Sequence, residues 1–272
     1  MPMTDIRTML DRLWDDYARL NPRAKAVHDL LTARGERVVN DHIAFRTFDL
    51  SPIALPAIAA HFTARGYTHG GDYDIAEKHA TAIHLEPPEE GMPKVFVSEL
   101  RTGECSPALR AIALGLADQV PDGAIADPSF LWSGVPWAPV SHATYEALKA
   151  ESEYASWVAA HGYRANHFTV AINALAFTDD IRVLNAFLKA NGYELNASGG
   201  EVKGTPAQLL EQSSTMAEEV PVPFADGVRQ VPACYYEFAK RYPGPDGRLF
   251  PGFIETSATR LFESTNEKRS AD

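Results

Sequence analysis

The chain has 272 residues, of which 45% are hydrophobic and 22% are charged, a composition typical of a folded protein with one large core or two modest ones. Disorder, a coiled coil and a membrane span are not expected, because no apolar run approaches the ~20 residues that crossing a bilayer requires. Twenty-five basic and 36 acidic residues give a net charge of −11, which disfavours nucleic acid and a membrane surface as partners.

The first predicted elements are two helices within residues 1–35. Apolar residues from Ile6 to Leu20 recur on one helical face, Asn21 is expected to cap the second helix, and Gly35 ends it. The pattern then changes to an alternation at period two, which is typical of a half-buried strand. The elements predicted next are a strand over 42–48, a helix from 55 or 56 to 65, and strands over 76–85 and 94–100.

Residues 101–160 are predicted to be mostly helical and to connect two similar sets of elements, with a helix over 144–160. In the second set, Thr178 is expected to cap a helix that ends at Gly192. The other elements of this set are a strand over 166–172, a segment over 209–216, a loop with Pro221, Pro223 and Gly227, a strand over 233–239 and a short helix near 258–263. The polar tail that follows is expected to fray.

Two pairs of landmarks indicate an internal repeat. His42 and His167 each begin a predicted strand and are 125 residues apart, while Gly66 and Gly192 each end a predicted helix and are 126 residues apart. Duplication predicts an α+β fold in which two βαβββ-type modules form a partly closed barrel around a metal site. We expect one compact domain over 1–272. Its parts are a helical N-terminal segment over 1–37, a first module over 38–100, a mainly helical connector over 101–163, and a second module with a C-terminal helix and tail over 164–272.

The first strand of each module carries a histidine on its polar face. Residues two apart on a strand share a face, so His42 and Arg46 point into the predicted cleft while the apolar alternates face a helix. His167 occupies the matching position of the second module, and Glu237 is the candidate carboxylate on the last strand. Two histidines and one carboxylate form the facial triad typical of oxygen-activating Fe(II), which leaves coordination positions open.

Each of these residues also has a purely structural interpretation. A single histidine in a strand is most often a partly buried residue whose hydrogen bonds are satisfied. Glu237 could be a surface carboxylate or a partner for Lys240 or Arg241, and Arg46 could pair with Asp41 or Asp49. No motif in the chain supports a hydrolase triad, a nucleotide site or a dinucleotide site.

Four segments of the chain resemble the signature blocks of one protein family. The segments are Asp41–Thr47, Asn166–Thr169, Glu211–Ala217 and Cys234–Ala239. Together they are similar to the 2-oxoadipate dioxygenase/decarboxylase family, also called 2-hydroxyglutarate synthase, which belongs to the vicinal-oxygen-chelate superfamily. The resemblance extends from about Val38 to Glu263, and this chain would be a short form of the family.

The resemblance implies that His42, His167 and Glu237 hold Fe(II) and that Arg46 holds a substrate carboxylate. It implies conversion of 2-oxoadipate and O2 to 2-hydroxyglutarate and CO2, a step of lysine catabolism, with the 2-oxo acid chelating the iron through its C1 carboxylate and C2 oxygen. Both oxygen atoms of O2 end in the products, so no other cosubstrate is required. Further substrate contacts are expected at Ser213, Ser214, Tyr235 and Ser257.

Two other functions are compatible with the same residues. One is a glyoxalase-like lyase or isomerase that uses zinc, nickel or manganese as a Lewis acid and does not need oxygen. The other is a non-catalytic module that binds a small acid, in which the histidines are structural. Two widely separated cysteines and the absence of a signal-peptide pattern predict a cytoplasmic protein, whereas the oligomeric state cannot be predicted from these residues.

Overall fold

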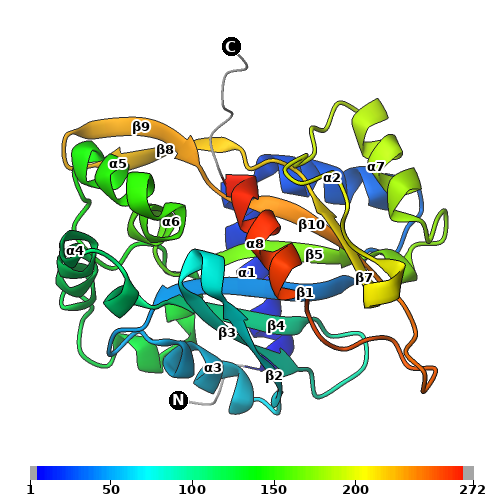
Figure 1. The fold of residues 1–272 in the computed structure, drawn as a ribbon, viewed down its shortest axis with the longest axis horizontal. Helices are drawn as coiled ribbons and strands as arrows, with labels where there is room; N and C mark the ends of the chain where they lie inside the picture. Colours follow the sequence, from blue (N-terminus) through cyan, green and yellow to red (C-terminus); the bar gives the residue numbers. More distant parts are fainter. Residues whose placement is uncertain (1–4, 266–272) are drawn as a thin grey trace.

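The structure, a computed structural model, describes residues 5–265 and places strands of both predicted modules in one eight-stranded sheet (Figure 1). The strand order is β2-β3-β4-β1-β5-β10-β7-β6. The strands are β1 Asn40–Phe48, β2 Thr68–Ile75, β3 Ala80–Glu86, β4 Lys94–Leu100, β5 Ala165–Ala171, β6 Lys203–Thr205, β7 Leu210–Ser214 and β10 Tyr235–Arg241.

The two halves of this sheet follow one plan. In the first half β1 runs parallel to β4, with β3 and β2 outside it, and in the second half β5 runs parallel to β10, with β7 and β6 outside it. The two first strands, β1 and β5, pair antiparallel at the centre. This symmetry confirms the predicted duplication and the α+β fold of paired βαβββ modules.

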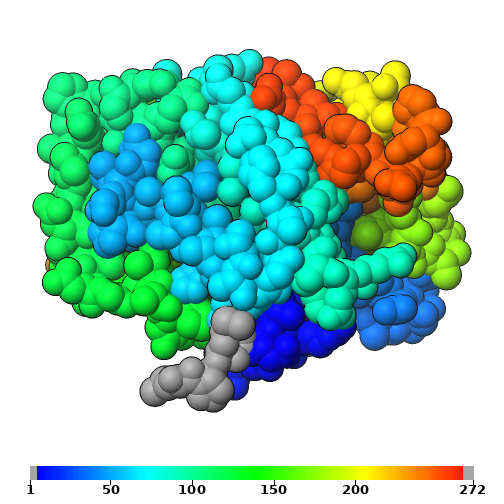
Figure 2. Space-filling view, turned by 90° about the horizontal axis from the view of Figure 1, so that it is seen from below, coloured from blue at the N-terminus to red at the C-terminus, as the bar shows by residue number. Residues whose placement is uncertain are grey.

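Eight α-helices surround the sheet in the part of the chain that the structure describes. They are α1 Ile6–Leu20, α2 Pro22–Ala33, α3 Leu55–Thr63, α4 Pro107–Ala117, α5 His142–Glu151, α6 Glu153–His161, α7 Ile181–Ala190 and α8 Glu255–Phe262. Figure 1 shows α1 behind the sheet and α8 across its front. Figure 2 shows residues 55–100 in the middle of one face, with the helical connector at one end and segments of the second module at the other. No helix among residues 5–265 is long and apolar enough to cross a bilayer.

The outer face of the sheet is the apolar face, as the alternation of side chains predicts. Phe45 of β1 packs against Phe62 of α3, with ring centroids 5.6 Å apart. Phe168 of β5 packs against Trp14 and Tyr17 of α1, at 5.1 and 4.9 Å. Burial of each such ring contributes about 1.5–3 kcal/mol to folding. The inner face is therefore left to the polar residues of β1, β5 and β10.

Several predicted elements differ from the observed ones. β2 is missed because its sequence has two glycines and two aspartates on an exposed edge strand. The strand predicted over 76–85 begins only at Ala80, after the 3₁₀ turn Ala76–Lys78. The predicted loop after Met216 is a hairpin of β8 Glu219–Phe224 and β9 Gly227–Pro232. Its prolines alternate with buried residues on an edge strand, where proline is tolerated.

The predicted helix caps also need correction. Asp180, not Thr178, caps α7, because the Asp180 carboxylate accepts from the Arg182 amide. Asn21 occupies the N-cap position of α2, but its side chain makes no capping bond and accepts instead from the Cys234 amide at 3.1 Å. Ser152 divides the helix predicted over 144–160 into α5 and α6, since its side chain caps α6. The tail expected to fray lies mostly outside the described residues.

Candidate active site

Three neighbouring strands at the centre of the sheet bring the predicted metal ligands together. His42 lies on β1, His167 on β5 and Glu237 on β10, and all three are at least 95% buried. The Nε2 atoms of the two histidines are 3.3 Å apart. The carboxylate oxygens of Glu237 lie 3.6 Å from His42 Nε2 and 3.2 Å from His167 Nε2. The three side chains thus present ligand atoms within 4.8 Å of one another, as a single metal ion requires.

A β-bulge before each histidine supplies the residue that orients it. The pairing of β1 with β5 skips Asp41 on one strand and Asn166 on the other, so each is an extra residue in its strand. Asp41 Oδ1 lies 2.8 Å from His42 Nδ1, and Asn166 Oδ1 lies 3.1 Å from His167 Nδ1. An Nδ1–H that donates to an oxygen fixes the tautomer in which the Nε2 lone pair is free to bind a metal.

Burial keeps both imidazoles in the neutral form that binds metals. It lowers the pKa of His42, although the Asp41 carboxylate opposes this shift. It lowers the pKa of His167 well below the usual value, with a further contribution from the nearby His42 ring. Asp41 itself stays ionised, because Arg241 binds it through two hydrogen bonds of 2.7 and 2.9 Å and lowers its pKa against the effect of burial.

The Glu237 carboxylate lacks a partner for one of its oxygens. Oε1 accepts a 2.6 Å hydrogen bond from Gln212 Nε2, while Oε2 has no hydrogen-bond partner among the described residues. Burial raises the pKa of this group to about 8, although Gln212 lowers it. A buried carboxylate that faces two neutral imidazole nitrogens is the donor set that a divalent cation would satisfy.

The sheet register shows why this group has three candidate ligands instead of four. Glu237 lies opposite Thr169, two positions beyond His167, and the repeat-related position in the first module is Phe96, opposite Ala44. An apolar ring therefore stands where a fourth ligand would be expected from the duplication. A metal ion held by these three groups alone would keep coordination positions open for a substrate, as catalytic metal sites require.

Arg46 faces the same interior as His42, as the strand alternation predicts. It is only 2% exposed, and its guanidinium lies over the rings of Phe262, Tyr154 and Trp157 at 4.7, 5.2 and 5.4 Å. Its Nε and Nη2 have no hydrogen-bond acceptor within the described chain. Neither Asp41 nor Asp49, the partners considered above, binds it. A permanent cation that is buried without a carboxylate indicates a binding position for an anionic group.

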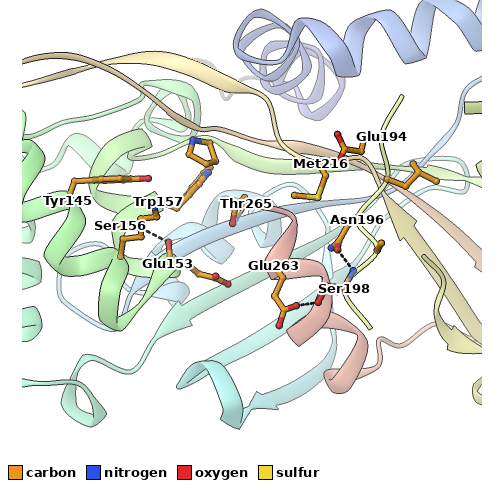
Figure 3. A pocket seen from close by; sticks show the side chains of 14 residues that line it. Tyr145, Glu153, Ser156, Trp157, Glu194, Asn196, Ser198, Met216, Glu263 and Thr265 are labelled. Carbon is orange, nitrogen blue, oxygen red and sulfur yellow. Dashed lines mark hydrogen bonds between the residues drawn. The ribbon is translucent and has the colours of Figure 1, made fainter. Parts of the chain in front are cut away.

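The space next to the ligands is almost filled by the C-terminal part of the chain. A cavity of about 20 Å³ adjoins the three ligands, walled by the rings of Phe96, Phe253 and Phe262. A second cavity of about 860 Å³ lies beyond Arg46, and two of its wall residues, Trp157 and Thr265, contact the guanidinium (Figure 3).

The remaining predicted substrate-binding residues are distributed over both faces of the sheet. Tyr235 stacks on the His167 ring at 4.6 Å and points its hydroxyl toward Arg46, which lowers a Tyr235 pKa that burial and Glu237 raise. Ser214 reaches Ser264 at 2.8 Å. Ser257 is buried on α8. The expectation that Ser213 contacts the substrate needs correction. Its hydroxyl donates to Asn185 of α7 on the opposite face of the sheet, because strand alternation directs it away from the ligands.

Sequence reasoning did not assign a role in the site to several residues that the structure places there. No local pattern selects Gln212, Phe96 or Phe253. These residues reach the ligands only through strand pairing or through the C-terminal segment that folds back over the site. Asp41 and Asn166 did carry a signal, since each is the polar residue immediately before a repeat-related histidine. The structural roles proposed for Glu237 are excluded, because Lys240 binds Asp179 and Arg241 binds Asp41.

The paired modules and their shared eight-stranded sheet give this chain a glyoxalase-like fold. A solved structure of a glyoxalase-superfamily protein from Ralstonia eutropha JMP134 has the same fold, with a TM-score of 0.73 and 24% identity over 90% of this chain and 84% of that one.

Closer similarity identifies the family. The family model for 2-oxoadipate dioxygenase/decarboxylase matches residues 5–126 and 124–250, and the chain belongs to this family. The chloroplastic enzyme of that name from Arabidopsis thaliana is 30% identical over 97% of this chain and 78% of its own length. The structure of rice (Oryza sativa) hydroxyglutarate synthase with 2-oxoadipate is 31% identical, with a TM-score of 0.90, over 95% of this chain and 91% of that one. A structure from Shewanella frigidimarina is 50% identical, with a TM-score of 0.89, over 93% of this chain and 98% of that one.

Proposed function

We propose that this protein oxidises and decarboxylates 2-oxoadipate with O2, giving 2-hydroxyglutarate and CO2, and that His42, His167 and Glu237 hold Fe(II) for the reaction. The observation that carries the proposal is the buried His-His-Glu group together with Arg46, a buried arginine on the same sheet face that binds no carboxylate among residues 5–265. The family relation and the rice enzyme's complex with 2-oxoadipate support the choice of substrate.

The donor set fits a redox-active ion with open coordination positions. Two neutral imidazoles and one carboxylate are the facial set that Fe(II) oxygenases use, and when bound the ion would supply the coordination of a 2-oxo acid and the activation of O2. Asp41 and Asn166 hold the two rings in the tautomer that binds through Nε2. Gln212 holds the Glu237 carboxylate and leaves its second oxygen directed at the histidines.

Arg46 would bind the carboxylate at the far end of the substrate. It follows His42 by four residues, which separates the two Cα atoms by roughly 13 Å along the strand. Ala44, between them on the same face, has only a methyl side chain. A planar guanidinium with two free donor atoms matches a carboxylate, and the Tyr235 hydroxyl, which also lacks a hydrogen-bond partner within residues 5–265, is placed to donate to it.

The walls around the ligands would protect the reaction from water. Phe96 and Phe253 pack against each other at 4.9 Å, and Phe253 lies edge-on to the His42 ring at 4.8 Å. Leu261 and Phe262 close the side next to α8. An apolar enclosure excludes bulk water and strengthens the attraction between Arg46 and a bound carboxylate.

Oxygen uptake coupled to CO2 release tests this function. The protein is loaded with Fe(II) under anaerobic conditions and then given O2 with 2-oxo diacids of four to seven carbons. We expect one O2 consumed and one CO2 released per 2-oxoadipate, with loss of both in Glu237→Gln. The control is Glu211→Gln, because Glu211 is equally buried on the neighbouring strand but binds Arg182 and Tyr242 away from the site. Turnover that needs no O2 would refute the oxygenase and indicate a glyoxalase-like lyase.

A further inference from the structure

The C-terminal segment 250–265, called the strap below, closes the metal site. The cavity beside the ligands, about 20 Å³, holds about one water molecule, whereas small-molecule pockets usually exceed about 300 Å³. The strap supplies part of the wall of this cavity, namely Phe253, Ile254, Ala258, Leu261 and Phe262. A six-carbon diacid does not fit into this cavity, so the strap must move before the diacid can bind beside the ligands.

Arg241 joins this strap to the metal ligand His42. Its Nη1 donates to the Phe250 and Gly252 carbonyls at 2.8 and 2.7 Å, and its Nε and Nη2 donate to Asp41. Asp41 in turn accepts from His42 Nδ1. Arg241 is 96% buried, and its guanidinium lies 5.0 Å from the centre of the Phe253 ring, which itself packs on His42.

The two histidines differ in the side chain that orients each ring. His167 is oriented by the neutral side chain of Asn166, whose Nδ2 has no partner within the described chain. His42 is oriented by a carboxylate whose position depends on a guanidinium shared with the strap. Among the described residues, it is the Nδ1 side of His42 that is linked through Asp41 and Arg241 to the strap.

We propose that Arg241 is a positioning residue that couples closure of the strap to the orientation of His42, so that metal binding favours the closed strap and strap opening weakens the metal site. The proposal rests on the metal site of the proposed function. Movement of the strap removes two of the four hydrogen bonds of Arg241 and its ring contact, which frees the guanidinium and Asp41 to shift. By thermodynamic linkage, the metal must stabilise the closed strap by the same factor that closure strengthens metal binding.

Hydrogen–deuterium exchange tests the coupling without relying on oxygen chemistry. Exchange of the backbone amides of 250–254 is measured with and without Co(II), and Co(II) affinity is measured separately by calorimetry. In the unaltered protein we expect Co(II) to slow this exchange about fivefold or more. The Arg241→Lys variant keeps the positive charge but loses the planar guanidinium that binds Asp41 and the strap at the same time. In this variant we expect Co(II) to bind without slowing exchange. The control Arg182→Lys alters an arginine bound to Glu211 and should preserve the effect.

Two further variants keep the test decisive if Arg241→Lys folds poorly. Asp41→Asn imitates the Asn166–His167 pair, so it should retain Co(II) but lose protection of the strap. Glu255→Ala removes the bond from the Asp74 amide that fastens the strap to β2, and should weaken Co(II) binding about fivefold in the unaltered background but not with Arg241→Lys.

The outcomes separate the two proposals. Unchanged protection in Arg241→Lys and Asp41→Asn, or no protection by bound Co(II) in the unaltered protein, would overturn the coupling and leave the metal site intact. Failure of the unaltered protein to bind Co(II) would refute the metal site of the proposed function and, with it, the coupling.

Discussion

Metal binding should displace a proton from Glu237, and the pKa of that residue sets the size of the effect. In the metal-free protein the Glu237 pKa is about 8, so the carboxyl group is about 90% protonated at pH 7 and about half protonated at pH 8. Both histidines have lowered pKa values, so they are already neutral and contribute few protons when a metal binds. We therefore expect about 0.9 proton to be released per metal ion at pH 7 and about 0.5 at pH 8.

The same proton makes the metal affinity depend on pH. A metal ion binds the ionised carboxylate, so affinity falls as pH drops below the pKa, approaching tenfold, or about 1.4 kcal/mol, per pH unit. With a Glu237 pKa of about 8, the dissociation constant for Co(II) should rise about 50-fold from pH 8 to pH 6. The direction follows from burial, which favours the neutral acid in the metal-free site.

Calorimetry in buffers with different ionisation enthalpies measures both quantities. Glu237→Gln should bind Co(II) weakly and release almost no proton, while Glu211→Gln should behave like the unaltered protein. Release of less than about 0.2 proton at pH 7, or equal affinity at pH 6 and pH 8, would refute the inference that metal binding displaces a proton from Glu237.

Three further substitutions test separate parts of the site. Arg46→Lys should keep Co(II) affinity within about twofold but lower kcat/KM for 2-oxoadipate about 100-fold, because a bidentate charged contact is lost, with little effect on a 2-oxo monoacid of similar length. Phe96→His places an imidazole at the repeat-related fourth position and should strengthen Zn(II) binding at least about tenfold while abolishing turnover. Gln212→Leu removes the donor to Glu237 and should weaken metal binding about tenfold.

Steady-state kinetics and metal titrations decide among these outcomes. An equal loss of kcat/KM for diacid and monoacid substrates in Arg46→Lys would mean that Arg46 stabilises the wall of the site and does not bind the substrate carboxylate. Unchanged zinc affinity in Phe96→His would contradict the equivalence of Phe96 and Glu237. Unchanged metal affinity in Gln212→Leu would show that the carboxylate is held by other contacts.

The amino-acid sequence by itself determined the fold class and the three metal-ligand candidates. Strand alternation is a local property with a period of two residues, so it places His42 and Arg46 on one face without knowledge of the neighbouring strands. The offsets between the two histidines and between the two helix-ending glycines agree within one residue and indicated the duplication, which the sheet order confirms. Both features can be recognised without the tertiary structure, because alternation depends on neighbouring residues and a repeat depends only on matching offsets along the chain.

Only the tertiary structure decided how the ligands are held and enclosed. The bulges that bring Asp41 and Asn166 beside the histidines arise from the register of β1 against β5. The contact of Arg241 with Asp41 joins residues 200 positions apart, and Phe96 reaches its place through pairing with β1. The strand register, and the way distant segments come together, depend on the packing of the whole sheet. A register shift of one residue would turn every side chain of a strand to the other face, so no local pattern encodes the register.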